Sequence, residues 1–195
     1  MSAKKKKKQK SLSAIQLSGN LLMLIAVVSL LYIYYPLIYI FLDPPPLKKI
    51  PQNGEFIQIQ KIHAQAPIVE NVNPWNETEY REKLFKGVAQ AKGTSHVGEK
   101  GTIFLFSHSS DLPWNITQYN VAFYKLGELK KGDLIELYKN GKKYIYKVRE
   151  KRVVWPNEVR YLKENLDKNQ LILQTCTPIG TDLQRLLVFA DPENT

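Results

Sequence analysis

The sequence contains a single cysteine, Cys176, and only three histidines among its 195 residues. One cysteine cannot form a disulfide within the chain, so no disulfide framework constrains the fold. No internal repeat is present, and no low-complexity tract occurs beyond one block of lysines. A lone cysteine in a chain that also has histidines is a candidate nucleophile, while the alternative is a small buried apolar residue.

Acidic residues are few, because 18 Asp and Glu stand against 28 Lys and Arg, which gives a net charge of +10. Such a balance suggests nucleic acid or an anionic surface as a partner. Much of the excess, however, comes from the lysines at 4–8 and 10, and the remaining charges are of mixed sign. No motif of interleaved aromatic and basic residues accompanies the lysines, so we expect no nucleic-acid partner.

Charge is absent from residues 21–42, a run of 22 mostly apolar residues. At about 1.5 Å per residue, this run predicts a helix that crosses a hydrocarbon core of about 30 Å. The length and flanks fit a membrane span better than a buried core helix. The lysine block lies before the run and Asp43 follows it, so residues 1–20 are expected in the cytoplasm and residues from 43 onward outside.

The exported part begins with a stiff segment, because three consecutive prolines follow Asp43. We expect a linker over 43–54, a folded domain over 55–190 and a tail over 191–195. Most patterns in the domain predict strands, and Asn140-Gly141 predicts a hairpin turn. The strands are expected near 56–60, 66–70, 101–108, 134–138, 143–148, 171–175 and 186–190, with short helices after Asn76 and near 157–166. Seven or eight short strands with little helix indicate a closed barrel or a sandwich.

The last two strands carry the first candidate site. Cys176 lies where the run 171–175 ends, and Arg185 lies where the run 186–190 begins. A turn-like segment at 178–182 separates the runs, so neighbouring strands would bring both side chains to one end of a sheet. A thiol beside a guanidinium is a reactive arrangement, because the positive charge favours the thiolate.

The histidine that best fits this site is His108, which directly follows a strand that is apolar on both faces and opens a polar loop. Catalytic side chains are often exposed where a rigid strand leads into a loop. The alternative is a structural histidine. His63 and His96 are expected to be solvated surface residues.

The segment Leu-Gln-Thr-Cys-Thr-Pro at 173–178, followed by Arg-Leu-Leu-Val at 185–188, resembles the sortase family. Sortases are membrane-anchored cysteine transpeptidases of the bacterial surface, with the motif T-L-x-T-C, then T-P and a later arginine. Ile172 replaces the first threonine, and Ser107 replaces a glycine that often precedes the family's histidine. The resemblance covers about residues 55–190. It implies a mainly β fold: a closed eight-stranded barrel with short helices.

The resemblance also implies a site of Cys176, His108 and Arg185 that cleaves an LPxTG-like sorting signal through a thioester. The acyl group would pass to an amine on the cell surface, on a cell-wall precursor or a pilin lysine. Thr177 could supply an oxyanion donor through its N–H, and Thr175 is a secondary candidate for substrate contact. No cofactor or metal is expected, since no acidic cluster is assigned to the calcium that some sortases use.

Two further expectations complete this reading. The protein would be a single-pass protein of a bacterial cell membrane, anchored through residues 21–42. A membrane-tethered β-barrel that binds a partner without catalysis is the alternative, and in that case Cys176 would be buried and inert.

Overall fold

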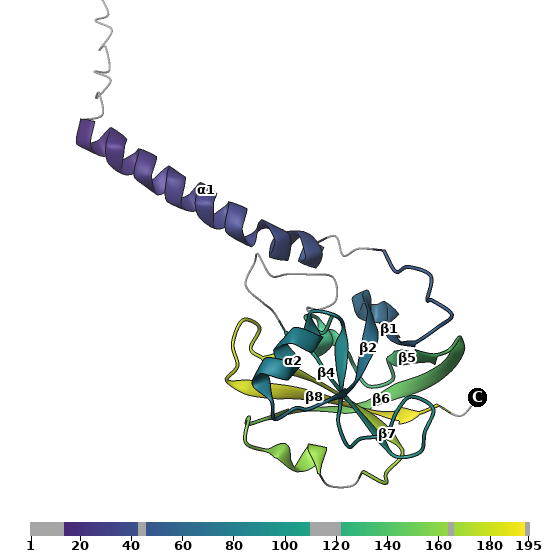
Figure 1. Cartoon of the computed structure of the whole chain (residues 1–195). Helices are drawn as coiled ribbons and strands as arrows, with labels where there is room; N and C mark the ends of the chain where they lie inside the picture. Colours follow the sequence, from purple (N-terminus) through teal and green to yellow (C-terminus); the bar gives the residue numbers. More distant parts are fainter. Residues whose placement is uncertain (1–13, 43–45, 110–121, 164–165, 194–195) are drawn as a thin grey trace, which may run out of the picture.

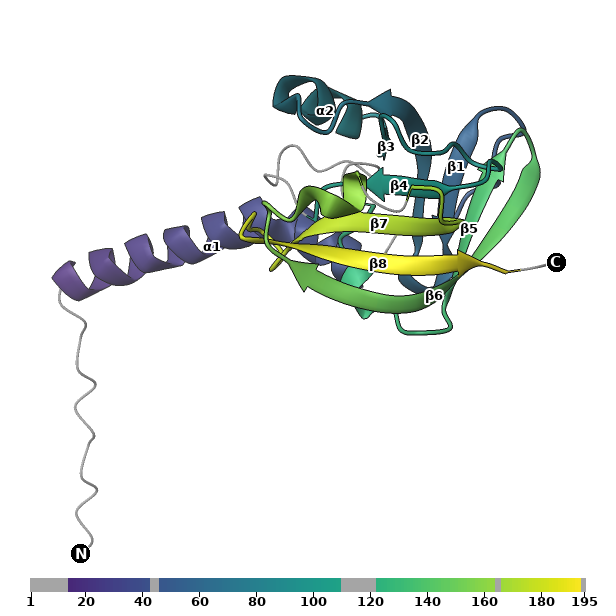
Figure 2. The ribbon, with the colours of Figure 1, turned by 90° about the horizontal axis from the view of Figure 1, so that it is seen from below.

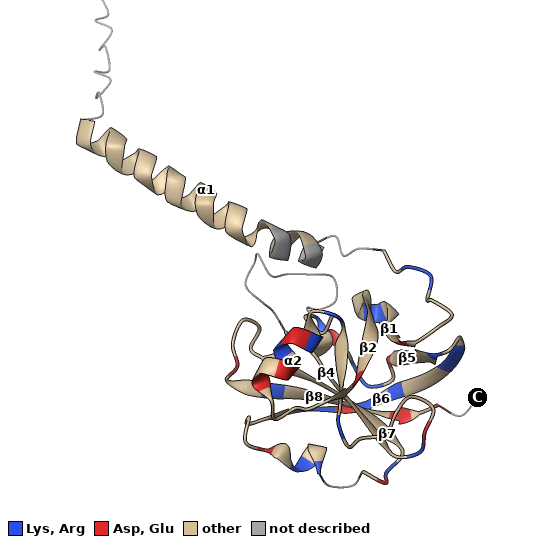
Figure 3. Ribbon diagram, viewed as in Figure 1, with Lys and Arg blue, Asp and Glu red and all other residues tan. Residues whose placement is uncertain are grey.

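The computed structural model describes residues 14–42, 46–109, 122–163 and 166–193 (Figure 1). Its first element is helix α1 (Ala14–Leu42), which starts seven residues before the predicted span. Residues 14–35 are long and apolar enough to cross a membrane. No charged residue lies in this helix (Figure 3), and its described side chains are exposed. The lysine block lies outside the described residues, so the orientation of the span stays a prediction.

The rest of the described chain forms a closed barrel of eight strands, which confirms the predicted fold class. The order around the barrel is β1-β2-β3-β4-β7-β8-β6-β5, and β5 pairs with β1 to close it. Two of the pairs, β2–β3 and β4–β7, are parallel. The strands are β1 (Glu55–Ile59), β2 (Ala64–Val72), β3 (Val88–Ala91), β4 (Thr102–Phe106), β5 (Leu134–Lys139), β6 (Lys142–Val154), β7 (Gln170–Thr177) and β8 (Gln184–Pro192).

Short helical segments connect some of the barrel strands. Helix α2 (Glu77–Leu84) begins as predicted, because Asn76 Oδ1 accepts a hydrogen bond from the Glu79 N–H at 3.2 Å. The helix predicted near 157–166 is instead the four-residue 3₁₀ turn η4 (Val159–Leu162). The side chain of its N-cap residue, Glu158, makes no capping hydrogen bond. Two further 3₁₀ turns are η1 (Gln60–Ile62) and η3 (Leu126–Glu128).

The hairpin turn between β5 and β6 is as predicted. Asn140 and Gly141 have φ of 49° and 78°, the two positive angles that a type I′ turn requires. Two strands differ from the prediction. β3 was not predicted, because four residues with two alanines give no clear strand signal. β6 continues past residue 148 to Val154, since its charged residues lie on an exposed surface that the apolar pattern does not reveal.

Alternation along the strands builds two separate cores. Ile103 and Leu105 of β4 point into the barrel, whereas Phe104 and Phe106 belong to a second cluster on its outer face. The outer cluster also contains Leu84 of α2, and Tyr161 of η4 packs against it. Figure 2 shows β7, β8 and β6 side by side beneath these helical segments. Both faces of β4 are therefore buried, as its apolar sequence indicated.

Candidate active site

Cys176 and Arg185 lie directly opposite each other, because they are Cα partners in the antiparallel pair β7–β8. Leu173 and Leu186 point into the barrel, so alternation places Cys176 and Arg185 on the outer face. This position follows from the short connection between the two strands, which the sequence already indicated. The pair therefore sits at the end of β7, against the outer apolar cluster.

His108 is brought to the same site by a different strand pair. β4 runs parallel to β7, and the pairing continues past the last residue of β4, because the Ser107 N–H donates to the Gln174 carbonyl at 3.1 Å. The Thr175 hydroxyl donates to the Ser107 carbonyl at 3.1 Å and is buried. The residue before His108 is thus held from both sides by the residues before Cys176. The adjoining loop positions 110 and 111 lie outside the described residues.

A cavity of about 390 Å³ unites the three side chains, since Cys176, His108 and Arg185 all line it. Phe104, Phe106 and Val154 from the barrel strands also line it, as do residues of α2 and η4. Two exposed tryptophans line it as well, Trp75 with 58% of its surface accessible and Trp155 with 60%. The cavity is therefore partly apolar and partly charged.

Burial dominates the electrostatics of the thiol. It raises the pKa of Cys176, and the nearby Asp182 carboxylate raises it further, while the Arg185 guanidinium lowers it. The expectation that Arg185 favours the thiolate is therefore correct in direction, but burial outweighs it. In this structure the thiol form of Cys176 is favoured at neutral pH.

The remaining predicted residues take different positions. Arg185 Nη1 donates to the carbonyls of Asp182 at 2.7 Å and Gln184 at 3.1 Å, which fixes the guanidinium on the β7–β8 connection. Thr175 lines the cavity, whereas Thr177 pairs with Gln184 at the end of β7 and is not among the described lining residues. His63 is exposed as expected, but His96 is half-buried and lies near Glu70, which corrects the expectation of a solvated residue.

Sequence reasoning missed several residues of the cavity. Tyr80 of α2 lines it, and both Arg185 and Cys176 influence the pKa of its phenol, which burial raises. Its ring packs edge-on against Phe106 with centroids 6.1 Å apart. Asp182 could have been found, because it lies in the turn between the cysteine and the arginine. Trp75 and Trp155 carry no local signal that distinguishes them from surface residues.

Comparison with known proteins identifies the family to which this architecture belongs. The sequence profile described as Sortase domain matches residues 57–193. Sortase D of Bacillus subtilis is 27% identical over 145 residues, which is 71% of this chain and 65%, just under two thirds, of that relative. Sortase C-1 of Actinomyces oris superposes with a TM-score of 0.60 at 29% identity, over 72% of each chain. Sortase C of Clostridium perfringens, solved with the C-terminal cell wall sorting motif, gives 0.58 at 30% identity, over 72% of this chain and 70% of that one. The chain therefore belongs to the sortase family.

Proposed function

We propose that this protein is a cysteine transpeptidase that cleaves an LPxTG-like sorting signal and joins the acyl fragment to an amine at the cell surface. One observation carries the proposal: Cys176 and Arg185 are direct cross-strand partners, and they share a cavity with His108. Acyl transfer needs a nucleophile, a proton carrier and a stabiliser of negative charge, and these three side chains meet that requirement.

In the first half-reaction the Cys176 sulfur attacks the scissile carbonyl carbon, and the C–N bond breaks to leave a thioester. His108 gives its proton to the departing amine. Because burial favours the neutral thiol, the Cys176 proton passes to His108 as the sulfur attacks, and this is the proton that the departing amine receives. Arg185 is a fixed cation with several N–H donors, and its Nη1 already donates to two backbone carbonyls. We assign it the role of binding the peptide or stabilising the oxyanion.

In the second half-reaction the acceptor amine attacks the thioester carbon and the C–S bond breaks, while His108 removes a proton from the amine and returns it to the Cys176 sulfur. The N–H of Thr177 is a second candidate oxyanion donor, and Thr175 is a secondary candidate for peptide contact. The acceptor is an amine of a cell-wall precursor or a pilin lysine. Residues 21–42 anchor the enzyme in the membrane, with residues 1–20 in the cytoplasm and the barrel outside. The long apolar helix α1 supports this anchor.

The test uses the full chain in detergent with a library of sorting-signal peptides and a soluble amine. Mass spectrometry should detect a cleaved peptide joined to the amine, together with an acyl group on Cys176. The Cys176→Ala variant should form neither product, because the sequence has no other thiol. Full cleavage by Cys176→Ala would overturn the proposal, and so would wild-type protein that fails to acylate with any peptide.

A further inference from the structure

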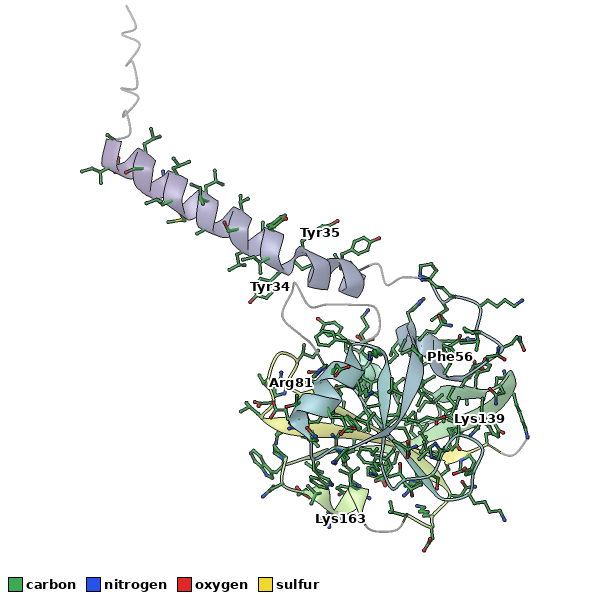
Figure 4. All side chains as sticks on the ribbon, in the orientation of Figure 1. Tyr34, Tyr35, Phe56, Arg81, Lys139 and Lys163 are labelled. Atoms are coloured by element: carbon green, nitrogen blue, oxygen red, sulfur yellow. The ribbon has the colours of Figure 1, made fainter. Side chains whose placement is uncertain are left out.

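A second cluster of ligating side chains lies at the barrel end opposite the cavity. Glu55 begins β1, Glu70 lies near the end of β2, and His96 follows β3 in the loop to β4. β1 is antiparallel to β2, and β2 is parallel to β3, so the three positions share one end. Cys176 belongs to the other end, where β4 and β7 finish. Figure 4 shows Lys139, the last residue of β5, far from Arg81, which lines the catalytic cavity.

The three side chains converge closely enough to share one ion. One ligand atom from each lies within 4.8 Å of the others, and His96 Nδ1 is 3.9 Å from Glu70 Oε2. The backbone of His96 is fixed by a turn, because its N–H donates to Glu99 Oε2 at 2.9 Å and the Glu99 N–H donates to the His96 carbonyl at 3.1 Å. The imidazole is thus presented from a defined position.

Glu55 gives a second and independent indication of a ligand. Its side chain is only 4% exposed, and neither carboxylate oxygen accepts a hydrogen bond from the described residues. Lys139 Nζ lies 2.8 Å from Oε1 as an ion pair. One ammonium carries a single positive charge, whereas two carboxylates, those of Glu55 and Glu70, converge beside it. A doubly charged ion would balance both.

We propose that Glu55, Glu70 and His96 bind a divalent transition-metal ion of the Zn²⁺ type, which takes the place of the Lys139 ammonium. An imidazole nitrogen combined with carboxylates suits Zn²⁺ better than Ca²⁺ or Mg²⁺, which prefer oxygen ligands. Tetrahedral Zn²⁺ holds such ligands about 3.4 Å apart, so the side chains must close by about 1 Å. Glu70 is 46% exposed and Lys139 is 34% exposed, so both can move without disturbing the core.

The test measures Zn²⁺ binding by calorimetry on the full chain in detergent, without a histidine tag. All variants carry Cys176→Ala, which removes the thiol as a competing ligand. We expect one strong site, a rise in Tm of several degrees at a hundredfold excess of Zn²⁺ over Kd, and weaker binding of Ca²⁺ by at least about 10²-fold. Glu70→Gln and His96→Ala should each weaken Zn²⁺ binding by about 10–100-fold or more, while Lys139→Met should strengthen it.

His63→Ala is the matched control, because it removes an exposed imidazole outside the cluster and should leave the affinity unchanged. Glu70 is exposed and His96 is half-buried outside the two apolar clusters, so their variants should fold even if Lys139→Met does not. The proposal is overturned if His96→Ala binds Zn²⁺ like its parent, or if Ca²⁺ binds as tightly as Zn²⁺. An unchanged affinity in a folded Lys139→Met variant would refute the displacement of the ammonium.

Discussion

Replacing Thr175 by valine tests how the two strands of the site are held together. The hydroxyl of Thr175 donates to the Ser107 carbonyl at 3.1 Å in a buried setting, and Ser107 directly precedes His108. Losing one buried hydrogen bond should lower the free energy of unfolding by about 0.5–1.5 kcal/mol. For a domain of this size that corresponds to about 2–4 °C in Tm for each kcal/mol.

Turnover should fall by more than the small loss of unfolding free energy alone would cause. Without this bond the backbone at Ser107 keeps its N–H bond to the Gln174 carbonyl but loses one attachment to β7, so it can shift relative to Cys176. A displacement of about 1 Å at a reacting group costs up to about 10²-fold in rate. We expect turnover of a sorting-signal peptide to fall by about 10–100-fold. It should be measured well below both melting temperatures, so that the variant and the wild type are fully folded.

Thr102→Val is the matched control, because Thr102 occupies the far end of the same parallel pair. Its buried hydroxyl donates to the Lys168 carbonyl at 2.9 Å and accepts from Gln170 Nε2 at 3.2 Å. This variant should lose at least as much stability as Thr175→Val and keep its turnover. Equal turnover in the two variants would refute the argument that the Thr175 bond positions His108.

Four further predictions concern the charges of the site and the membrane. Asp182→Asn should lower the pKa of Cys176, because it removes a charge that raises it, and alkylation by iodoacetamide at pH 7 should then be faster; an unchanged pH profile would contradict this. His108→Ala should lose about 10²–10⁴-fold in turnover, measured by peptide cleavage. Arg185→Lys should remain clearly impaired in the same assay, whereas recovery of most of the rate would show that charge alone suffices. Protease added to protoplasts should remove the barrel and spare residues 1–20, and protection of the barrel would refute the orientation.

The parts of the site that the sequence predicts are the local ones. Cys176 and Arg185 lie on two runs joined by a short turn, so their proximity follows from chain connectivity alone. His108 is separated from Cys176 by many residues, and it reaches the site through a parallel strand pair, for which no local pattern exists. The strand before it already favoured His108 among the three histidines, but its proximity to Cys176 was expected only from the family resemblance.

Other features depend on packing between distant segments. Tyr80 lies on the helix predicted after Asn76, but its place in the cavity depends on the packing of α2 against the outer apolar cluster. The fold class was accessible because the strand count and turn signals are strong. The convergence of Glu55, Glu70 and His96 was not, because it requires the order of three strands around the barrel.

Strands such as β4 and β7 contribute side chains to two separate cores. The residues that shape the cavity are therefore distinct from those that fill the barrel. Leu171 and Leu173 of β7 face the barrel interior, while Cys176 and the neighbouring outer positions face the cavity. Changes in α2 or in the segment carrying Trp155 can therefore reshape the cavity while the packing inside the barrel stays intact.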